Sequence, residues 1–485
     1  MKKRYTTCMA TVLCCLLYSS LLGNNATISN PQYNKQTRTL TFDIGWNNGF
    51  RVSTEWFDYI HLVIKVKNSN ENTWNPAPAF TATAISLQTP NSSNGGYTGV
   101  WHSPGFTSGT DGGRMIIQFT AGTFINPSFK IMAIEMVYAD HEDLGYTYHF
   151  GDGSTRNRLH DGSDENLPFA WAPPYPDIEV GDQAGELGST FNIPLPFAMS
   201  NIHKSMMKYE ITQGMYVDFL NCLTRPQQDT RTATDLSIGV SEVTEIYVMS
   251  ARTFPSLDNG IRCASTIPSS GRITFFCDGN NNGIGNETDD GLDRACNFLG
   301  SEDTKAILDW LHLMPMLQVE YELWSRGGGQ AVPGEFAWGS TAYHIIDLNG
   351  WNQEGTSSEV HNDLGTPGAH VSTNFSAKRV GVFAGASTTR EQSGASFYGI
   401  MDLSGSLVES VYSSLTNNGA ALPDPQEVGD GIIGIHGNHN QLSWNNTVLM
   451  ATGKMLSFGS GSPISLLNNV IETERSSSQG ARGVR

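Results

Sequence analysis

The sequence predicts an α+β fold in which an N-terminal β-sandwich, residues 24–129, precedes a larger, loop-rich domain, residues 130–485. Three observations lead to this prediction. Apolar and polar residues alternate in the first part, two stretches of the second part carry apolar residues at helical spacing, and Gly, Asn and Ser are frequent in between. Alternation is typical of strands with one buried face, and short strands separated by turn residues are typical of a β-sandwich.

The first 23 residues have the pattern of a secretory signal peptide. Basic residues at positions 2–4 precede an apolar run from 9 to 22, and the small residue Gly23 lies near the expected cleavage point. A membrane anchor is the alternative, but this run is too short to span a bilayer. We therefore expect an exported protein, secreted or held at the cell surface, without a transmembrane segment.

Strands are expected throughout the predicted β-sandwich. Leu40, Phe42 and Ile44 alternate with polar or small residues, the run 60–67 alternates in the same way, and residues 115–120 form a third apolar run. Turns rich in Gly, Asn and Ser separate these runs. No cluster of titratable side chains is apparent here, so we expect a packing or presentation module and not a catalytic one.

Two helices are expected in the second part. Thr212 and Ser301 are good N-cap residues, and each precedes apolar positions at helical spacing. The apolar faces consist of Tyr216, Phe219, Leu220 and Leu223 in the first helix and of Ala306, Ile307, Trp310 and Leu311 in the second. Such a stripe normally faces the core and not a ligand.

Residues 278–289 have the D-x-[DN]-x-[DN]-G spacing of a calcium-binding loop, although no flanking helices are evident. The expected ligands are Asp278, Asn280, Asn282, the backbone carbonyl of Ile284, and Asp289. Gly283 permits the sharp turn between them. Asp289 is one methylene shorter than the usual Glu, so we expect a weak site with a Kd of about 10⁻⁴–10⁻³ M. A metal-free polar turn is the alternative, since Asp, Asn and Gly also form turns.

Four cysteines remain once the signal peptide is removed. They are Cys222, Cys263, Cys277 and Cys296. An even number of cysteines in an exported protein predicts disulfides, whose pairing the sequence leaves open, and free buried thiols are the alternative. Because no C-x-x-C spacing occurs among them, neither a zinc knuckle nor a thioredoxin-type site is indicated.

The chain is acidic, with 29 Lys and Arg against 47 Asp and Glu, a net charge of −18. Loss of the signal peptide removes three basic residues and no acidic one, which makes the mature protein more negative still. A negative field repels phosphate backbones and anionic lipid. Nucleic acid is therefore not expected as a partner, whereas divalent cations are.

Five segments of the second part resemble, in the same order, signature blocks of the formylglycine-generating enzyme (sulfatase-modifying factor) family. They are 207–219, 315–327, 336–339, 398–409 and 480–485. The resemblance covers roughly residues 130–485. It implies that family's variant of the C-type-lectin-like fold, which has two helices, a small antiparallel sheet and much calcium-stabilised loop.

Enzymes of that family oxidise a substrate cysteine with a copper-binding pair of their own cysteines, which lie between the last two blocks. Here no cysteine follows Cys296. Cu(I) selects soft thiolate ligands, which Ser and Asn do not replace. The resemblance therefore implies a pseudoenzyme with no catalytic residue and no copper, stabilised by calcium. The alternative is a copper-dependent oxidase whose cysteines are relocated, with Cys263 and Cys277 as the pair.

The resemblance also implies a second calcium site at the turn 402–409. Its ligands would be the side chains of Asp402 and Glu409 and the backbone carbonyls of Gly405 and Leu407. The sequence departs from the family pattern here, with Ser406 in place of Asn and Val408 in place of Trp. The alternative is that the two carboxylates cap local backbone donors.

The segment 415–480 is hard to match to the family. Asn440, Trp444 and Asn445 are its candidate ligand-binding residues, because Trp supplies contact area and Asn adaptable hydrogen bonds. By a looser analogy with lectin folds, we expect this face to bind a protein or a glycan at the cell surface, or another copy of the chain. A structural component of a surface or secretion machine is a third hypothesis.

Overall fold

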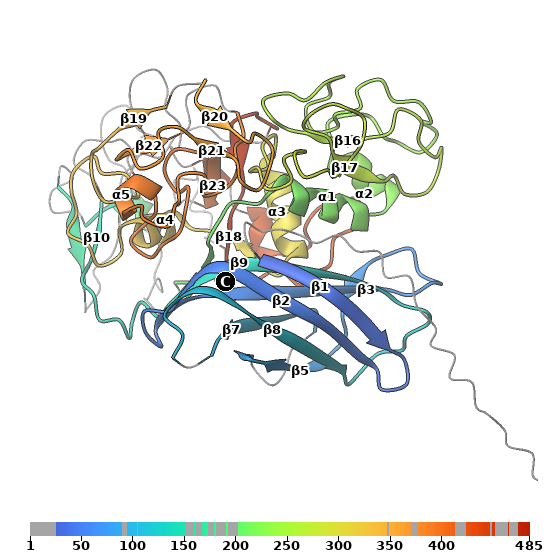
Figure 1. Cartoon of the computed structure of the whole chain (residues 1–485), viewed down its shortest axis with the longest axis horizontal. Coiled ribbons are helices and arrows are strands. Elements are labelled where there is room, and N and C mark those ends of the chain that lie inside the picture. The colour runs from blue at the N-terminus through green and yellow to red at the C-terminus, as the bar shows by residue number, and fades with distance from the viewer. Residues whose placement is uncertain are drawn as a thin grey trace, which may run out of the picture.

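The computed structural model describes most of the chain. The described residues are 26–89, 95–103, 105–151, 159–161, 167–172, 179–180, 191–192, 202–346, 349–370, 376–412, 423–446, 449–451, 464 and 474–485. The predicted signal peptide and much of the segment 415–480 lie outside them. Among the elements of the described part, strands far outnumber the five α-helices (Figure 1), which agrees with the α+β class in a mainly β form.

Two antiparallel sheets dominate the N-terminal part of the structure (Figure 1). The smaller sheet consists, in spatial order, of β1 (Ala26–Asn34), β2 (Thr39–Phe50), β8 (Ser108–Phe119) and β5 (Phe80–Ile85). The larger sheet consists of β18 (Met314–Pro315), β26 (Gly483–Val484), β15 (Ser205–Met207), β9 (Ser128–Ala139), β3 (Trp56–Lys67), β7 (Tyr97–His102) and β6 (Leu87–Gln88), and β4 (Asn75–Pro76) pairs with β3.

One apolar core contains side chains from both sheets. In β2, Leu40, Phe42 and Ile44 are buried while the residues between them are partly exposed, which confirms the predicted alternation. Ile60 and Leu62 of β3 belong to the same core. Since burying each such side chain contributes about 1.5–3 kcal/mol, this core fixes which face of each strand points inward.

The second face of β3 is buried as well, although its residues are partly polar. Val63 packs into another apolar core that includes residues of α1 (Gln213–Cys222). Nε2 of His61 lies 3.0 Å from the carbonyl oxygen of Leu311, and Nζ of Lys65 donates to the carbonyl oxygen of Gly431 at 2.8 Å. The larger sheet is therefore covered on both faces at β3, where the alternating pattern predicts one exposed face.

The two parts of the chain share the larger sheet. The boundary predicted between residues 129 and 130 falls inside β9, which pairs with β3 along its whole length. On its other edge β9 pairs with β15, and β26 at the end of the chain pairs with both β15 and β18. The second part therefore extends a sheet that the first part begins.

Both predicted helices are present. α1 begins after Thr212, whose hydroxyl accepts a hydrogen bond from the backbone N–H of Met215 at 3.3 Å. α3 (Ser301–Trp310) begins one residue earlier than predicted, because Gly300 is its N-cap and Ser301 its first residue. The other helices are α2 (Arg225–Thr230), α4 (Gln318–Arg326) and α5 (Arg390–Ser393). None of the helices that the structure describes has the length and apolarity needed to cross a bilayer.

The other strands of the second part are short. They are β10 (Tyr148–Phe150), β11 (Leu159–His160), β12 (Phe169–Trp171), β13 (Glu179–Val180), β14 (Phe191–Asn192), β16 (Ile261–Cys263), β17 (Phe275–Cys277), β19 (His344–Ile345), β20 (Trp351–Asn352), β21 (Val360–His361), β22 (Ala369–His370), β23 (Val408–Tyr412), β24 (Leu449–Ala451) and β25 (Gln479–Gly480). They carry the long loops in which the candidate site lies.

A buried ionic network lies where the two parts meet, in contrast to the expectation that titratable groups do not cluster in the first part. Nζ of Lys208 lies 2.8 Å from Oδ2 of Asp58 and 3.4 Å from Oε2 of Glu135. The imidazole of His102 lies between two carboxylates, 2.8 Å from Asp58 and 2.7 Å from Asp111. Sequence alternation misses such a network because its members come from four strands and a loop.

We predict that Glu135 makes the stability of the protein depend on pH. Burial raises the pKa of Glu135 to about 8, although the nearby Lys208 acts in the opposite direction. In the unfolded chain the pKa of Glu is about 4.3, so stability present below that pH is lost as the pH rises towards about 8, by an amount on the order of a few kcal/mol. Glu135→Gln mimics the protonated acid and should remove most of this loss.

Thermal unfolding measured from about pH 5 to about pH 8.5 tests this prediction. The midpoint of the wild-type protein should fall more steeply with pH than that of the Glu135→Gln variant. Glu142→Gln is the control, because Glu142 is exposed. Parallel pH profiles for wild type and Glu135→Gln would contradict the prediction.

Candidate metal centre

The predicted calcium loop, residues 278–289, follows β17 and folds as a series of tight turns. The carboxylate of Asp278 accepts hydrogen bonds from the backbone N–H groups of Asn282 at 3.0 Å and Gly283 at 3.1 Å. The side-chain oxygens of Asn280 and Asn282 each accept from the N–H two residues later. Gly283 has φ +89°, which glycine adopts without strain. These three side chains therefore stabilise the loop through the backbone.

The first carboxylate of the loop is also neutralised by a cation of the protein. Asp278 is buried, and its Oδ2 lies 2.6 Å from Nη1 of Arg262. The hydroxyl of Tyr247 lies within hydrogen-bond distance of two acceptors in the loop. They are Oδ1 of Asn281 at 2.7 Å and the backbone carbonyl oxygen of Asp278 at 3.1 Å. The carboxylate of Asp278 is thus paired with a guanidinium and with backbone N–H groups of its own loop.

A group of three acidic residues lies at the other end of the loop. Glu287, Asp289 and Asp290 place carboxylate oxygens within 4.8 Å of one another, which no other group of three or more Asp, Glu, His and Cys does in the described part of the chain. Asp289 belongs to the predicted ligand set, whereas Glu287 and Asp290 do not. Burial raises the pKa of Asp290 to about 6. The acidic run at 287–290 was the sequence signal that could have identified them.

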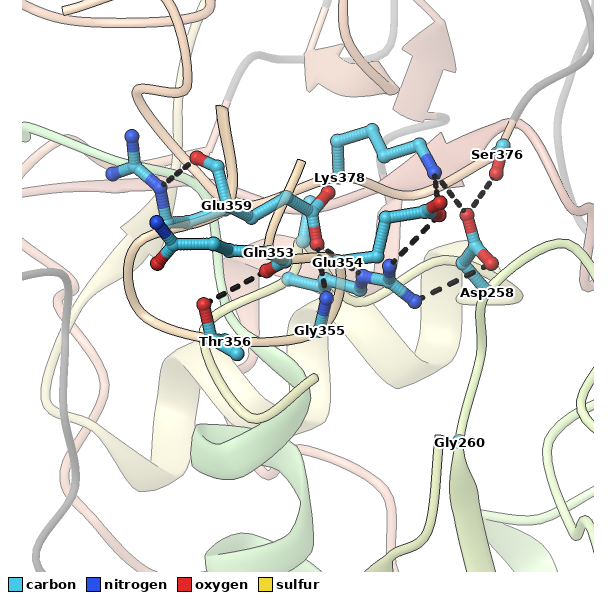
Figure 2. Close-up of polar contacts among 12 residues, drawn as sticks. Asp258, Gly260, Gln353, Glu354, Gly355, Thr356, Glu359, Ser376 and Lys378 are labelled. Carbon is cyan, nitrogen blue, oxygen red and sulfur yellow. Dashed lines mark hydrogen bonds and ion pairs between the residues drawn. The ribbon is translucent and has the colours of Figure 1, made fainter. Parts of the chain in front are cut away.

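A polar network joins four segments that are distant in sequence, at residues 258, 294, 354–359 and 376–378 (Figure 2). Nζ of Lys378 lies 2.7 Å from Asp258 and 3.5 Å from Glu354. The guanidinium of Arg294 lies 3.3 Å from Asp258 and 2.8 Å from Glu359. The two cations are therefore committed to carboxylates of this network.

The loop 353–359 reaches the acidic group through Gly355. Its N–H donates to Glu359 at 2.7 Å (Figure 2), and its carbonyl oxygen accepts from the N–H of Gly291 at 2.9 Å. A Cβ at this position would overlap the carbonyl oxygen of Asp289, and Gly355 has φ +76°. Only glycine fits this contact, which ties the loop to the backbone of Asp289.

The residues of the second predicted calcium site bind protein donors. Oδ2 of Asp402 accepts from the N–H of Gly381 at 2.5 Å, and Oε1 of Glu409 accepts from Nε of Arg482 at 2.8 Å. Glu409 and Arg482 are fully buried. Gly405 and Leu407 lie in the turn between them, and the N–H of Leu407 donates to Glu210 at 3.3 Å. Neither donor is local: Gly381 lies 21 residues before Asp402, and the Arg482 guanidinium lies 73 residues after Glu409, so the contacts differ from the local backbone capping of the alternative.

The predicted disulfides are not formed, which corrects that expectation. The structure has four free, buried thiols at Cys222, Cys263, Cys277 and Cys296, all within the apolar core that contains α1. The register of the β16–β17 hairpin pairs Cys263 with Phe275 and Cys277 with Ile261. The two cysteines are thus offset by about 7 Å along the strands in addition to the strand spacing, too far for a disulfide.

The candidate ligand-binding residues do not form one exposed face. Trp444 is fully buried in a core that includes residues of α4 and β23, and its Nε1 donates to the carbonyl oxygen of Glu427 at 3.0 Å. This corrects the expectation that Trp444 supplies contact area. Asn440 is exposed and donates to Asp430 at 3.2 Å. The side chain of Asn445 lies outside the described part.

In comparisons with known proteins, the chain matches no family model, no curated protein and no solved structure. Its function is therefore inferred from its own residues.

We predict that Gly355→Ala destabilises the protein more than Gly365→Ala. Both glycines have positive φ values, at which Ala costs about 1–2 kcal/mol. At Gly365 a Cβ meets nothing within 4 Å, whereas at Gly355 it overlaps the backbone of Asp289. Overpacking adds roughly 1–3 kcal/mol, so urea unfolding should show a difference of at least about 1 kcal/mol between the variants. Equal losses of unfolding free energy in the two variants would contradict the close contact between Gly355 and the backbone of Asp289.

Proposed function

We propose that this protein is an exported, calcium-stabilised and non-catalytic relative of the formylglycine-generating enzymes, with an N-terminal β-sandwich and a C-type-lectin-like second part. In this proposal it acts at the cell surface as a binding or structural module. Its partner is a protein, a glycan or another copy of the chain.

The observation that carries this proposal is the state of the thiols. Burial raises the pKa of Cys222 to about 12 and that of Cys263 to about 11, and it also raises the pKa of Cys277 and Cys296. Copper ligation and attack on oxygen-derived intermediates both require an accessible thiolate. Four buried thiols at these pKa values favour a structural role over the alternative of an oxidase with relocated cysteines.

The contacts among the resembling segments support the relationship. Met206, next to the segment 207–219, pairs with Val484 of the last segment, and Val484 also pairs with Met314, next to the segment 315–327. Arg482 of the last segment binds Glu409 of the segment 398–409. Segments that are far apart in sequence thus meet in one place, as the signature blocks of a single domain would.

The segment 423–446 supports a binding role through its exposed apolar side chains. Ile435 is 80% exposed and Leu442 is 78% exposed, and Ile432 is exposed as well. Single exposed apolar residues are ordinary, whereas a contiguous exposed apolar patch marks a surface that contacts another macromolecule. In this proposal the three side chains belong to one such patch. They favour a protein partner over a glycan at this part of the surface.

We predict that calcium stabilises the protein. At about 10 mM calcium, a site with a Kd of about 10⁻⁴ M adds roughly 2.7 kcal/mol to the free energy of unfolding. Thermal unfolding in calcium and in EDTA measures this effect. Magnesium is the control and should act weakly, because it loses its water ligands reluctantly. Identical midpoints in calcium and EDTA would refute calcium stabilisation.

We also predict that the protein is inactive as an oxidase. Copper titration should show no thiolate-to-copper absorption, and oxygen should not be consumed in the presence of a Cys-containing peptide. A Cys263→Ser, Cys277→Ser double variant is the control for adventitious copper. Oxygen consumption by the wild-type protein that this variant lacks would establish the alternative function.

A further inference from the structure

We propose that Glu287, Asp289 and Asp290 bind the divalent cation of this loop, and that Asp278, Asn280 and Asn282 shape the loop without forming the centre of the site. This inference rests on the proposed calcium binding and changes its ligands. Three carboxylates are hard oxygen donors, the kind that calcium prefers.

A buried, unpartnered carboxylate oxygen points to the ligand. Asp290 is 1% exposed, and its Oδ2 accepts from the N–H of Glu287 at 2.6 Å. Its Oδ1 is buried and accepts no hydrogen bond of normal geometry within the described residues, although an interaction with the backbone N–H of Asn280 opposes the rise that burial causes in the pKa of this carboxyl. Because a buried polar oxygen without a partner is unfavourable, a cation bound between Asp290, Asp289 and Glu287 would satisfy it.

The two ends of the loop also differ in how far nearby cations compensate their negative charge. Asp278 has a guanidinium at 2.6 Å, and both of its oxygens accept backbone hydrogen bonds. None of the ion pairs within the described residues involves Glu287, Asp289 or Asp290, and the nearby Arg294 and Lys378 are paired elsewhere. The negative charge that lacks compensation is therefore at the C-terminal end of the loop.

Asn282 keeps Glu287 in this group. Its Nδ2 donates to Oε2 of Glu287 at 2.5 Å, while its Oδ1 accepts from the N–H of Ile284 at 2.7 Å. The spacing motif predicted this Oδ1 as a calcium ligand. In the structure Oδ1 instead accepts a hydrogen bond within the turn, and the Nδ2 of the same amide holds the carboxylate of Glu287 in place.

Terbium luminescence and calcium calorimetry on the full chain test the inference. Tyr247, which contacts the loop, is suited to sensitise a bound Tb³⁺ ion. Glu287→Gln and Asp290→Asn should each weaken calcium binding at least tenfold, whereas Asn280→Ala should change it less than threefold. Glu354→Gln is the matched control for loss of a nearby, exposed acidic residue.

The outcomes distinguish this inference from the proposed function. If the wild-type protein binds neither ion, both are overturned. If Asn280→Ala abolishes binding while Glu287→Gln and Asp290→Asn retain it, the inference fails and calcium binding by the predicted ligands stands. Circular dichroism in EDTA checks the folding of each variant, and Glu287→Gln decides the question if Asp290→Asn does not fold, since Glu287 is only partly buried.

Discussion

The junction between the two parts of the chain depends on a buried cation, the ammonium group of Lys208. Its Nζ donates to Asp58 and to the carbonyl oxygen of Asn48, and its backbone N–H donates to the carbonyl oxygen of Glu135. One residue thus contacts β9 through its backbone and both β2 and β3 through its side chain. Because an unpaired buried ion costs several kcal/mol, the ammonium and the Asp58 carboxylate each require the other to be in place. The two parts are coupled for this reason.

The two parts are also joined by β26 of the larger sheet. β26 lies between β15 and β18, so the last residues complete a sheet whose other strands come from both parts. Arg482, just before β26, places its guanidinium against Glu409 and the carbonyl oxygens of Met207 and Met401. Breaking a buried ion pair by moving one partner away leaves an uncompensated charge, which costs about 3–5 kcal/mol. The Arg482–Glu409 pair therefore disfavours other placements of these two segments.

Features that depend on neighbouring residues were predictable from the sequence, and features that depend on distant partners were not. The alternation at Leu40 and Phe42 and the cap at Thr212 follow from local geometry. Lys65 is buried because it binds Gly431, which is 366 residues away, and Trp444 is buried because it packs into a core formed by other segments. Neither the charge of Lys65 nor the size of Trp444 indicates these distant contacts. At the candidate site the turns of the loop were readable from its spacing. The pairing of Asp278 with Arg262 was not.

The carboxylates of this protein divide into two classes by the charge that compensates them. Glu409 and Asp278 each have a guanidinium within 2.8 Å, and both stand where a calcium ligand was predicted. A carboxylate so compensated gains little from an ion, because the cation would first have to displace a buried arginine. The acidic group around Asp290 has no such partner among the described residues. Spacing motifs identify oxygen atoms that can converge, but the local balance of charge decides which of them require a metal ion.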